Sequence, residues 1–446
     1  MNIFSRFLKV HTLVTKERGI VMSNYRGMGY LRGKLATKAS RNNKRYKYYE
    51  MKNRMIDISN VIPKEFRWLT ECLGWCTKTV DAMADRLSVV EFGNDLFNMQ
   101  EIYNMNNPDV LFDSAIISSL ITSCSFIYIS QVPGQFPRLQ VIDGTNATGI
   151  IDPITNMLIE GYAVLERDIY KNPTKEAYFI KGVTYFYEKG KKPYTQRNIA
   201  PYPLLVPIIH RPDAKRPFGH SRITRACMSI QQGAMRTLKR GEVAGEFYSF
   251  PQKYILGLAN DVEFDKWKAT ISSFIQITEG ENGEKPTVGQ FQQQSMTPFV
   301  EQLRMSASLF AGETGLTLDD LGFPSENPSS NDAIKSQHEN LRLAARKAQK
   351  TFTSGFINAG YLAACLRDGY PYERNQIYST TLKWAPIFEP DAATLSSIGD
   401  GAIKINQAVP GYFGKENLKE LTGINYSQDA SITPNLDDMY KDDLNE

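Results

Sequence analysis

The sequence predicts an α+β fold assembled from several parts. Between about residues 124 and 210 it shows short apolar runs separated by Pro, Gly and Asn, a pattern typical of β-strands. Outside that region apolar residues recur at spacings of three and four over long stretches, which indicates amphipathic helices. With 446 residues, of which 42% are apolar, the chain is long enough for two or three domains with real cores.

The first part of the chain combines helices with strands. Residues 60–105 read as helical, and the uncharged run 114–132 reads as a buried helix that continues into a strand. Serine and threonine dilute this run too much for a membrane span. The strands expected next are SFIYIS, RLQVID, YAVLER, AYFIKGVTYFYE and LLVPIIH.

A long helix is expected after the β-rich region, from about Ser221 to Phe247. Glycines inside a helix cost ~1 kcal/mol each relative to alanine. Those of this helix either allow a neighbouring backbone to approach closely or mark a helix end near Gly241. The apolar face is Ile223, Cys227, Ile230, Ala234 and Leu238; the polar, basic face is Arg225, Ser229, Gln232, Arg236, Lys239 and Arg240; the glycines are Gly233, Gly241 and Gly245.

A second helix begins at Thr297-Pro298, an N-cap followed by proline, and Gly312 and Gly315 end it. Its face is Phe299, Leu303, Ala307 and Phe310.

A turn-rich loop, GFPSENPSSNDAIKSQH, follows at 322–338 and opens into a third helix. Ser329 to Asp332 has the form of a capping signal, and a continuous apolar stripe predicts a helix of roughly 50 Å over 331–367. Gly355 and Gly360 suggest a kink in it. A strand at 379–388, two short helices near 390–407 and 414–422, and an acidic end complete the chain.

Charge is unevenly distributed along the chain. Residues 1–54 carry fourteen Lys and Arg against two Glu, a net charge of +12, so residues 55–446 sum to −8. The last twenty residues hold six acids and one lysine. Two readings of the basic segment remain open: it contacts nucleic acid or an acidic partner, or it is a solvated and partly disordered leader. Met22 could be the true start.

Cysteine and histidine are sparse. Five scattered cysteines indicate reduced thiols, and the Cys72 and Cys76 pair at helical spacing reads as buried thiols rather than a metal site. The basic segment lacks the charge-free apolar core of a signal peptide.

Catalytic and nucleotide-binding motifs are missing from the sequence. It contains no phosphate-binding loop, nucleophile elbow or zinc-protease motif. Asp319-Asp320 could ligate a cation, but adjacent acids at a helix end are more often a cap. His220 and His338 have packing or capping roles by default. The sequence therefore predicts no enzyme activity, no cofactor and no metal site.

Four stretches together resemble the portal proteins of tailed bacteriophages, in the form found in phages of Gram-positive hosts. They are LLVPIIHRPDAKRPFGHSRIT at 204–224, FYSFPQKYILGL at 247–258, residues 309–352 and residues 393–423. Their order and spacing carry the resemblance, which covers residues 55–425.

The resemblance implies a portal fold, with an α/β wing domain, a two-helix stem, a small α/β clip, a long bridging helix and a helical crown. The expected bounds are wing 55–215 with the strand 379–388, stem helices 216–247 and 297–316, clip 248–296, tunnel loop 317–331, long helix 332–370 and crown 388–425. A basic N-terminal arm at 1–54 and an acidic tail at 426–446 lie outside it.

The function that the resemblance implies is a homo-oligomeric ring, usually a dodecamer, at one capsid vertex of the virion. Double-stranded DNA is packaged and ejected through the ring, so the channel wall should contact phosphates weakly and without sequence preference. The implied partners are terminase, the major capsid and scaffolding proteins and a head-completion adaptor, with assembly in the host cytoplasm and no membrane. The DNA-facing loop residues would be Ser325, Glu326, Asn327, Ser329, Ser330 and Asn331, and the stem would present Arg225, Arg236, Lys239 and Arg240.

Two other functions remain as alternatives. One is a metal-dependent nucleic-acid-processing enzyme that uses Asp319 and Asp320. The other is a helical scaffold or adaptor protein that binds partners through the helix at 331–367.

Overall fold

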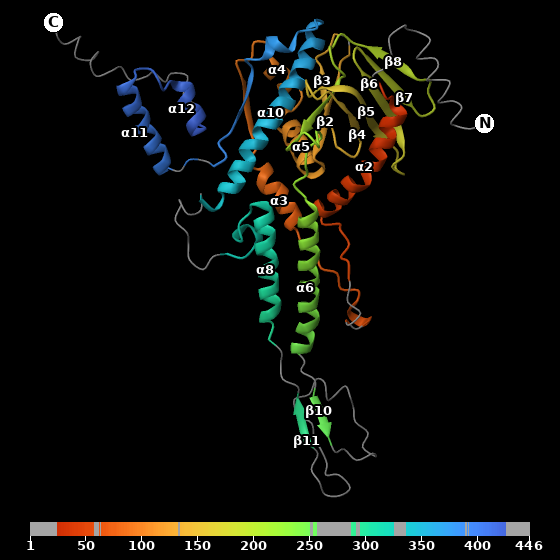
Figure 1. Cartoon of the computed structure of the whole chain (residues 1–446), viewed down its shortest axis with the longest axis vertical. Helices are drawn as coiled ribbons and strands as arrows, with labels where there is room; N and C mark the ends of the chain where they lie inside the picture. Colours follow the sequence, from red (N-terminus) through yellow and green to blue (C-terminus); the bar gives the residue numbers. More distant parts are fainter. Residues whose placement is uncertain are drawn as a thin grey trace, which may run out of the picture. The chain divides into compact units, whose positions relative to one another are not determined.

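The computed structural model describes residues 25–57, 62, 64–132, 134–249, 253–256, 287–290, 295–324, 336–388, 390 and 392–424. The chain divides into two compact units, each built from separate segments (Figure 1). Unit 1 comprises Met1–Tyr46, Val80–Arg222 and Leu341–Glu446, and unit 2 comprises Lys47–Thr79 and Ile223–Asn340. Helices and strands are both well represented, so the α+β class is confirmed.

Two antiparallel sheets lie in unit 1. The three-stranded sheet has the order β3-β2-β9, and the five-stranded sheet runs β4-β5-β6-β7-β8 as a meander. The strands are β2 (Cys124–Ser130), β3 (Arg138–Ile142), β4 (Ala147–Ile151), β5 (Leu158–Arg167), β6 (Pro173–Ile180), β7 (Val183–Glu188), β8 (Tyr194–Arg197) and β9 (Leu205–Ile209). Every strand expected from the sequence in this region is present, whereas β4 and β8 were missed.

Helix α5 (Pro108–Thr122) packs on the three-stranded sheet and leads directly into β2. This confirms the buried helix followed by a strand that the uncharged run predicted. The serines of the run are used internally: the Ser119 hydroxyl donates to the Ile208 carbonyl of β9 and lies 2.7 Å from the Ser125 hydroxyl. No helix within the described residues is long and apolar enough to cross a membrane.

Most of helix α2 (Met28–Tyr49) packs in unit 1, so this part of the basic arm expected at 1–54 is not separate; residues 1–24 of the expected arm lie outside the described residues. Leu31 and Leu35 are buried against Tyr162 and Val164 of β5. The buried Glu160 carboxylate caps the start of the helix by accepting from the backbone N–H groups of residues 26 and 27 at 2.9 and 3.1 Å. The physical reason for the error is that the basic side chains surround an apolar stripe, which the high charge of the segment obscured.

Helix α10 (Glu339–Asp368) is the longest described helix. Two of its glycines allow close packing, and the kink expected at them stays a prediction. A Cβ at Gly355 would lie 2.8 Å from Ile208 and 3.2 Å from the Pro207 carbonyl, and one at Gly360 would lie 2.9 Å from the sulfur of Met99. The helix therefore fits directly against β9 and α4 (Met99–Asn104).

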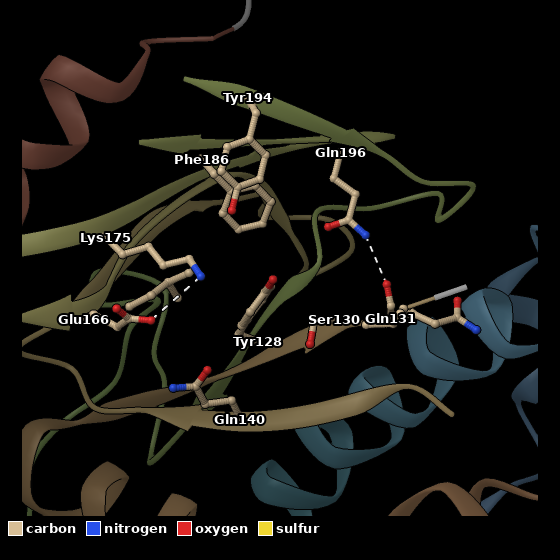
Figure 2. A pocket seen from close by; sticks show the side chains of 11 residues that line it. Tyr128, Ser130, Gln131, Gln140, Glu166, Lys175, Phe186, Tyr194 and Gln196 are labelled. Carbon is tan, nitrogen blue, oxygen red and sulfur yellow. Dashed lines mark hydrogen bonds and ion pairs between the residues drawn. The ribbon is translucent and has the colours of Figure 1, made fainter. Parts of the chain in front are cut away.

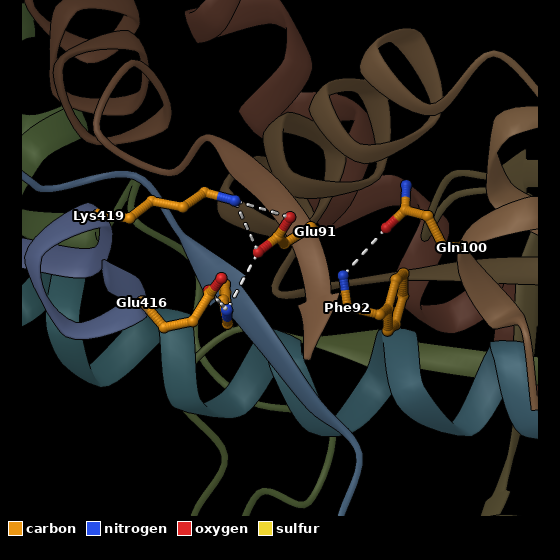
Figure 3. A network of polar contacts seen from close by, with 6 residues as sticks. Glu91, Phe92, Gln100, Glu416 and Lys419 are labelled. Atoms are coloured by element: carbon orange, nitrogen blue, oxygen red, sulfur yellow. Dashed lines mark hydrogen bonds and ion pairs between the residues drawn. The ribbon is translucent and has the colours of Figure 1, made fainter. Parts of the chain in front are cut away.

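The C-terminal part of unit 1 contains a two-stranded ribbon and two helices. Strand β1 (Val89–Gly93) pairs antiparallel with β12 (Thr381–Trp384), and α11 (Ala392–Ala408) and α12 (Lys415–Thr422) follow. Figure 3 shows the polar network that joins α12 to the ribbon: Glu91 accepts from Lys419 at 3.1 Å and from Lys383 at 3.0 Å. The helices and the strand expected here are confirmed to within a few residues.

Unit 2 contains the helices α6 (Arg225–Ser249) and α8 (Thr297–Thr314), which pack against each other (Figure 1). The antiparallel ribbon of β10 (Lys253–Leu256) and β11 (Thr287–Gln290), with the short 3-10 helices η2 (Lys64–Phe66) and η3 (Asp319–Leu321), also belongs to it. The third 3-10 helix among the described residues, η4 (Arg374–Ile377), lies in unit 1.

The continuous helical reading of 60–105 is wrong. The only helix between η2 and β1 is α3 (Trp75–Ala84), with Trp68 exposed ahead of it. Cys76 is buried as expected, but Cys72 lies before the helix and is exposed. Spacings of three and four also occur by chance over short irregular stretches, so the sequence predicted a helix over too long a range.

Candidate functional site

The paired helices α6 and α8 are the described elements on which the predicted stem residues lie. The two helices pack against each other, and at one end Phe310 of α8 also packs on Trp75 of α3, with the ring centres 5.5 Å apart. Near it the Thr224 hydroxyl donates to Glu313 at 3.2 Å. Ala307 and Phe310 of the predicted α8 face are buried, which confirms that face at this end.

Two adjacent glutamines fasten α6 to the first turn of α3 and to the segments that precede it. The Gln231 side chain accepts from the Cys76 N–H at 2.8 Å and donates to the Leu73 carbonyl at 2.5 Å. Gln232 accepts from the Ile56 N–H at 2.9 Å and donates to the Arg54 carbonyl at 3.1 Å. Both side chains are buried. Each amide satisfies one backbone donor and one backbone acceptor of the neighbouring segments.

Lys239 does not belong to an exposed polar face, contrary to the sequence prediction. Its side chain is 2% exposed, and its ammonium donates to Asp57 at 2.9 Å and to the Arg67 carbonyl at 3.2 Å. Burial of an ammonium is tolerated because its charge is paired and its protons are bonded. The acidic partner lies 182 residues earlier in the chain, so spacing could not reveal it.

The other predicted stem cations are less buried. Arg225 and Arg240 are exposed, while Arg236 is half-buried and donates to the Ile56 carbonyl at 3.4 Å. Of the four cations, two therefore remain available on the surface of the chain.

The glycines of α6 do not mark a close backbone contact or a helix end. A Cβ at Gly233 or Gly241 would find its nearest neighbour at 3.8 Å, an ordinary distance, and one at Gly245 would find open space within the described part of the chain. The helix continues past all three to Ser249.

Apolar side chains point away from the α6–α8 contact. On α8, Met305 is 57% exposed and Leu309 is 59% exposed. On α6, Ile230 and Leu238 of the predicted apolar face are only half-buried. A second apolar surface is therefore left on the helix pair of a single chain.

The predicted DNA-facing loop lies outside the described residues, from Ser325 through Asn331. The preceding segment is described, and its Asp320 carboxylate accepts from both the N–H and the hydroxyl of Thr317 at 2.9 Å. His338 also approaches Asp320 at 3.8 Å. These contacts are those of a structural cap. No group of three or more metal-ligating side chains is found in the described ranges, and nothing there supports the metal-dependent alternative.

Unit 1 contains a cavity of about 440 Å³ between its sheets (Figure 2). Tyr128 lies on one side, its pKa raised to about 12 by burial, and the rings of Phe186 and Tyr194 stack at 5.0 Å on another. The rim is polar, with Lys175 and Glu166 3.8 Å apart. No residue singled out from the sequence lines it.

Comparison with known proteins gives relatives over most of the chain. No family model matches. The portal protein of Mycobacterium phage L5 is 23% identical over 402 residues, which cover 83% of this chain and 80% of that protein. The portal protein of Mycobacterium phage D29 is 23% identical over 409 residues, covering 85% and 82%. The chain is a homologue of phage portal proteins.

Solved structures similar to this portal homologue come from a gene transfer agent particle. The native virion gives a TM-score of 0.43 at 12% identity, and the neck of the native particle, computed with C12 symmetry, gives 0.45 at 13%. Each match covers 79% of this chain and 90% of the other.

Proposed function

We propose that this chain is a phage portal protein, a structural subunit of the ring at one capsid vertex through which DNA is packaged and ejected. The observation that carries the proposal is homology to two portal proteins over more than 80% of the chain. The capping role of Asp320 is consistent with a structural protein that has no enzyme activity.

In this proposal α6 and α8 form the stem, the β10–β11 ribbon belongs to the clip, and α11 and α12 form the crown. The tunnel loop at 317–331 approaches the moving DNA through the serine, asparagine and glutamate side chains at 325–331. Their hydrogen-bonding groups carry little positive charge, and a weak grip on the phosphates lets the duplex slide. Terminase, capsid, scaffolding and head-completion proteins bind the assembled ring in the virion.

Ring closure would cover the second apolar surface of the helix pair. Leaving Met305 and Leu309 in water forfeits roughly 1 kcal/mol or more for each side chain, because each exposes more than half of its area. Packing against the stem of the next copy recovers that energy at every interface of a closed ring. We expect the closed ring to contain twelve copies of the chain.

The test is the mass of the assembled protein, measured by native mass spectrometry and negative-stain microscopy with and without scaffolding protein. A closed annulus of identical copies is expected. The Met305→Glu variant should shift the protein toward monomers, since it buries a charge at each stem contact. The matched control Gln302→Glu adds the same charge to an exposed, already polar position of α8 and should still form rings. Monomers under all conditions would refute the proposal.

A further inference from the structure

Helix α2 carries a row of cations on one face. Lys34, Lys38, Arg41 and Arg45 are spaced by four, three and four residues, so they line up along the helix. We call them the basic stripe. The ammonium groups of Lys34 and Lys38 lie 4.8 and 5.1 Å from the centre of the Phe218 ring. The stripe therefore lies partly against the protein rather than extending freely into water.

No carboxylate of the described part of the chain touches the stripe, although the buried Glu160 attracts Lys34 at longer range. None of its four residues makes an ion pair there, whereas Arg32 on the same helix pairs with Glu176 at 2.5 Å. Lys34 donates to the Gly149 carbonyl at 2.6 Å and Arg45 to the Thr122 carbonyl at 3.2 Å. The buried Nε of Arg45 has no hydrogen-bond partner among the described residues.

The pKa values record this unfavourable environment. Burial and then the neighbouring Lys38 lower the pKa of Lys34 to about 8. Burial and then Arg41 and Arg216 lower the pKa of Arg45 to about 10. Partly buried cations that repel one another destabilise the fold unless an anion joins them.

A second element adds charge to the same place. Arg216 lies in a turn in which its N–H donates to Asp213 and its carbonyl accepts from the Gly219 N–H at 2.8 Å. Gly219 has φ +71°, and a Cβ there would lie 2.1 Å from the His210 carbonyl, so only glycine fits. The turn holds a fifth cation, Arg216, close enough to Arg45 to help lower the pKa of its guanidinium.

We propose that the basic stripe binds the acidic segment at 426–446 of this chain. That segment holds the pairs Asp437-Asp438 and Asp442-Asp443. Five residues of extended chain separate the pairs by about 17 Å. The eleven residues from Lys34 to Arg45 rise about 16 Å along the helix. Successive side chains of an extended chain point in opposite directions, so one carboxylate of each pair faces the stripe, and the two that do so match its two ends.

An acidic peptide suits this surface better than duplex DNA. A single extended chain can bring carboxylates down to cations that are half-buried beside Phe218, whereas the phosphates of a duplex are fixed on a wide, rigid cylinder. A segment tethered to the same protein also acts at a high effective concentration, so individually weak ion pairs suffice.

The first test is zero-length carbodiimide cross-linking of the full-length protein followed by mass spectrometry. Cross-links from the carboxylates of 437–443 should concentrate on Lys34 and Lys38, although Lys44 and Lys47 of the same helix are more exposed. They should disappear at high salt, which screens the attraction. Cross-links that favour Lys44 and Lys47 would overturn the proposal.

The second test is the rate at which a lysine-specific protease cuts after Lys441, in the middle of the acidic segment. Losing three ion pairs should speed the cut about tenfold in Lys34→Gln/Lys38→Gln/Arg41→Gln. The Asp437→Asn/Asp438→Asn/Asp442→Asn/Asp443→Asn variant, which leaves the described fold untouched, should show the same increase. The charge-matched control Lys44→Gln/Lys47→Gln/Lys52→Gln should cut like the wild type.

Equal cutting rates in the wild type and the Asp→Asn variant would overturn the proposal. Duplex DNA is the competing ligand, tested by fluorescence anisotropy of a labelled 30-bp duplex, a probe of roughly three helical turns. Duplex binding that depends on Lys34, Lys38 and Arg41, together with unchanged cutting at Lys441, would assign the stripe to nucleic acid instead.

Discussion

Replacing Glu160 by alanine should release the start of helix α2 from the sheet of unit 1. The Glu160 side chain is fully buried and accepts three hydrogen bonds: from the backbone N–H groups of residues 26 and 27, and from the Tyr178 hydroxyl at 2.6 Å. Carboxylates are favoured at a helix N-terminus, where the unpaired N–H groups and the helix dipole are both positive.

The free-energy cost of Glu160→Ala follows from the three donors that lose their acceptor. An unsatisfied buried donor costs about 1–3 kcal/mol. The N–H of residue 26 is only partly buried and water can reach it, so we take the low end for each donor, about 3 kcal/mol in total. Local opening of α2 should then become roughly 150-fold more frequent. Glu160→Gln keeps one acceptor oxygen and turns an N–H₂ group toward a donor, so about half of this loss is expected.

Hydrogen–deuterium exchange of the amides in residues 31–46 measures this opening directly. The matched control is Glu166→Gln on the same strand, where an exposed carboxylate lies 3.8 Å from Lys175 and contributes little. If exchange in Glu160→Ala stayed within threefold of the wild type, the capping role of Glu160 and the assignment of α2 to the core of unit 1 would both be wrong.

Three further predictions concern other parts of the chain. Burial lowers the pKa of His210 to about 4, so between pH 4 and 6.5 the unfolded chain binds more protons than the folded chain. The free energy of unfolding should therefore fall by up to about 3 kcal/mol on acidification across that window. Thermal melts of His210→Asn should not show this dependence on pH. Lys419→Ala removes one cation from Glu91 and should cost at most about 1 kcal/mol, seen as faster exchange in α12 with no change in β5. Deleting residues 323–329 should leave rings intact by microscopy but reduce DNA packaging, and loss of the rings would contradict the tunnel-loop assignment.

The strands and long helices were predictable because their patterns are local. The β2 and β9 runs are mostly apolar and are buried on both faces, and the repeat in α10 extends over 30 residues. Strand β8 was missed because all four of its residues are exposed, so it has no apolar face that a pattern could detect. Strand β4 is short and contains a glycine, which the sequence rules read as a turn.

The prediction for helix α2 was wrong for a different reason. Its charge is high enough to suggest a solvated arm, yet its fold depends on Leu31, Leu35 and a carboxylate more than 110 residues away. Sequence alone gives no way to pair residue 27 with Glu160. The same holds for Lys239 and Asp57, which are in contact only because α6 packs on a segment from the beginning of the chain.

Helix α6 shows why assigning one apolar and one polar face to an amphipathic helix is insufficient for a subunit of the proposed ring. The sequence assigned one apolar and one polar face to α6, but the structure buries Gln231, Gln232 and Lys239 and leaves Ile230 and Leu238 half-exposed. Buried amides and a paired ammonium need specific partners at specific distances, so they fix the helix in one register and rotation where apolar contacts alone would tolerate sliding. The apolar side chains are then free to serve a second surface. In the proposed ring α6 is held within its own chain and also meets another copy. The polar contacts described above hold it within its chain, which leaves the apolar side chains for the proposed contact with the other copy.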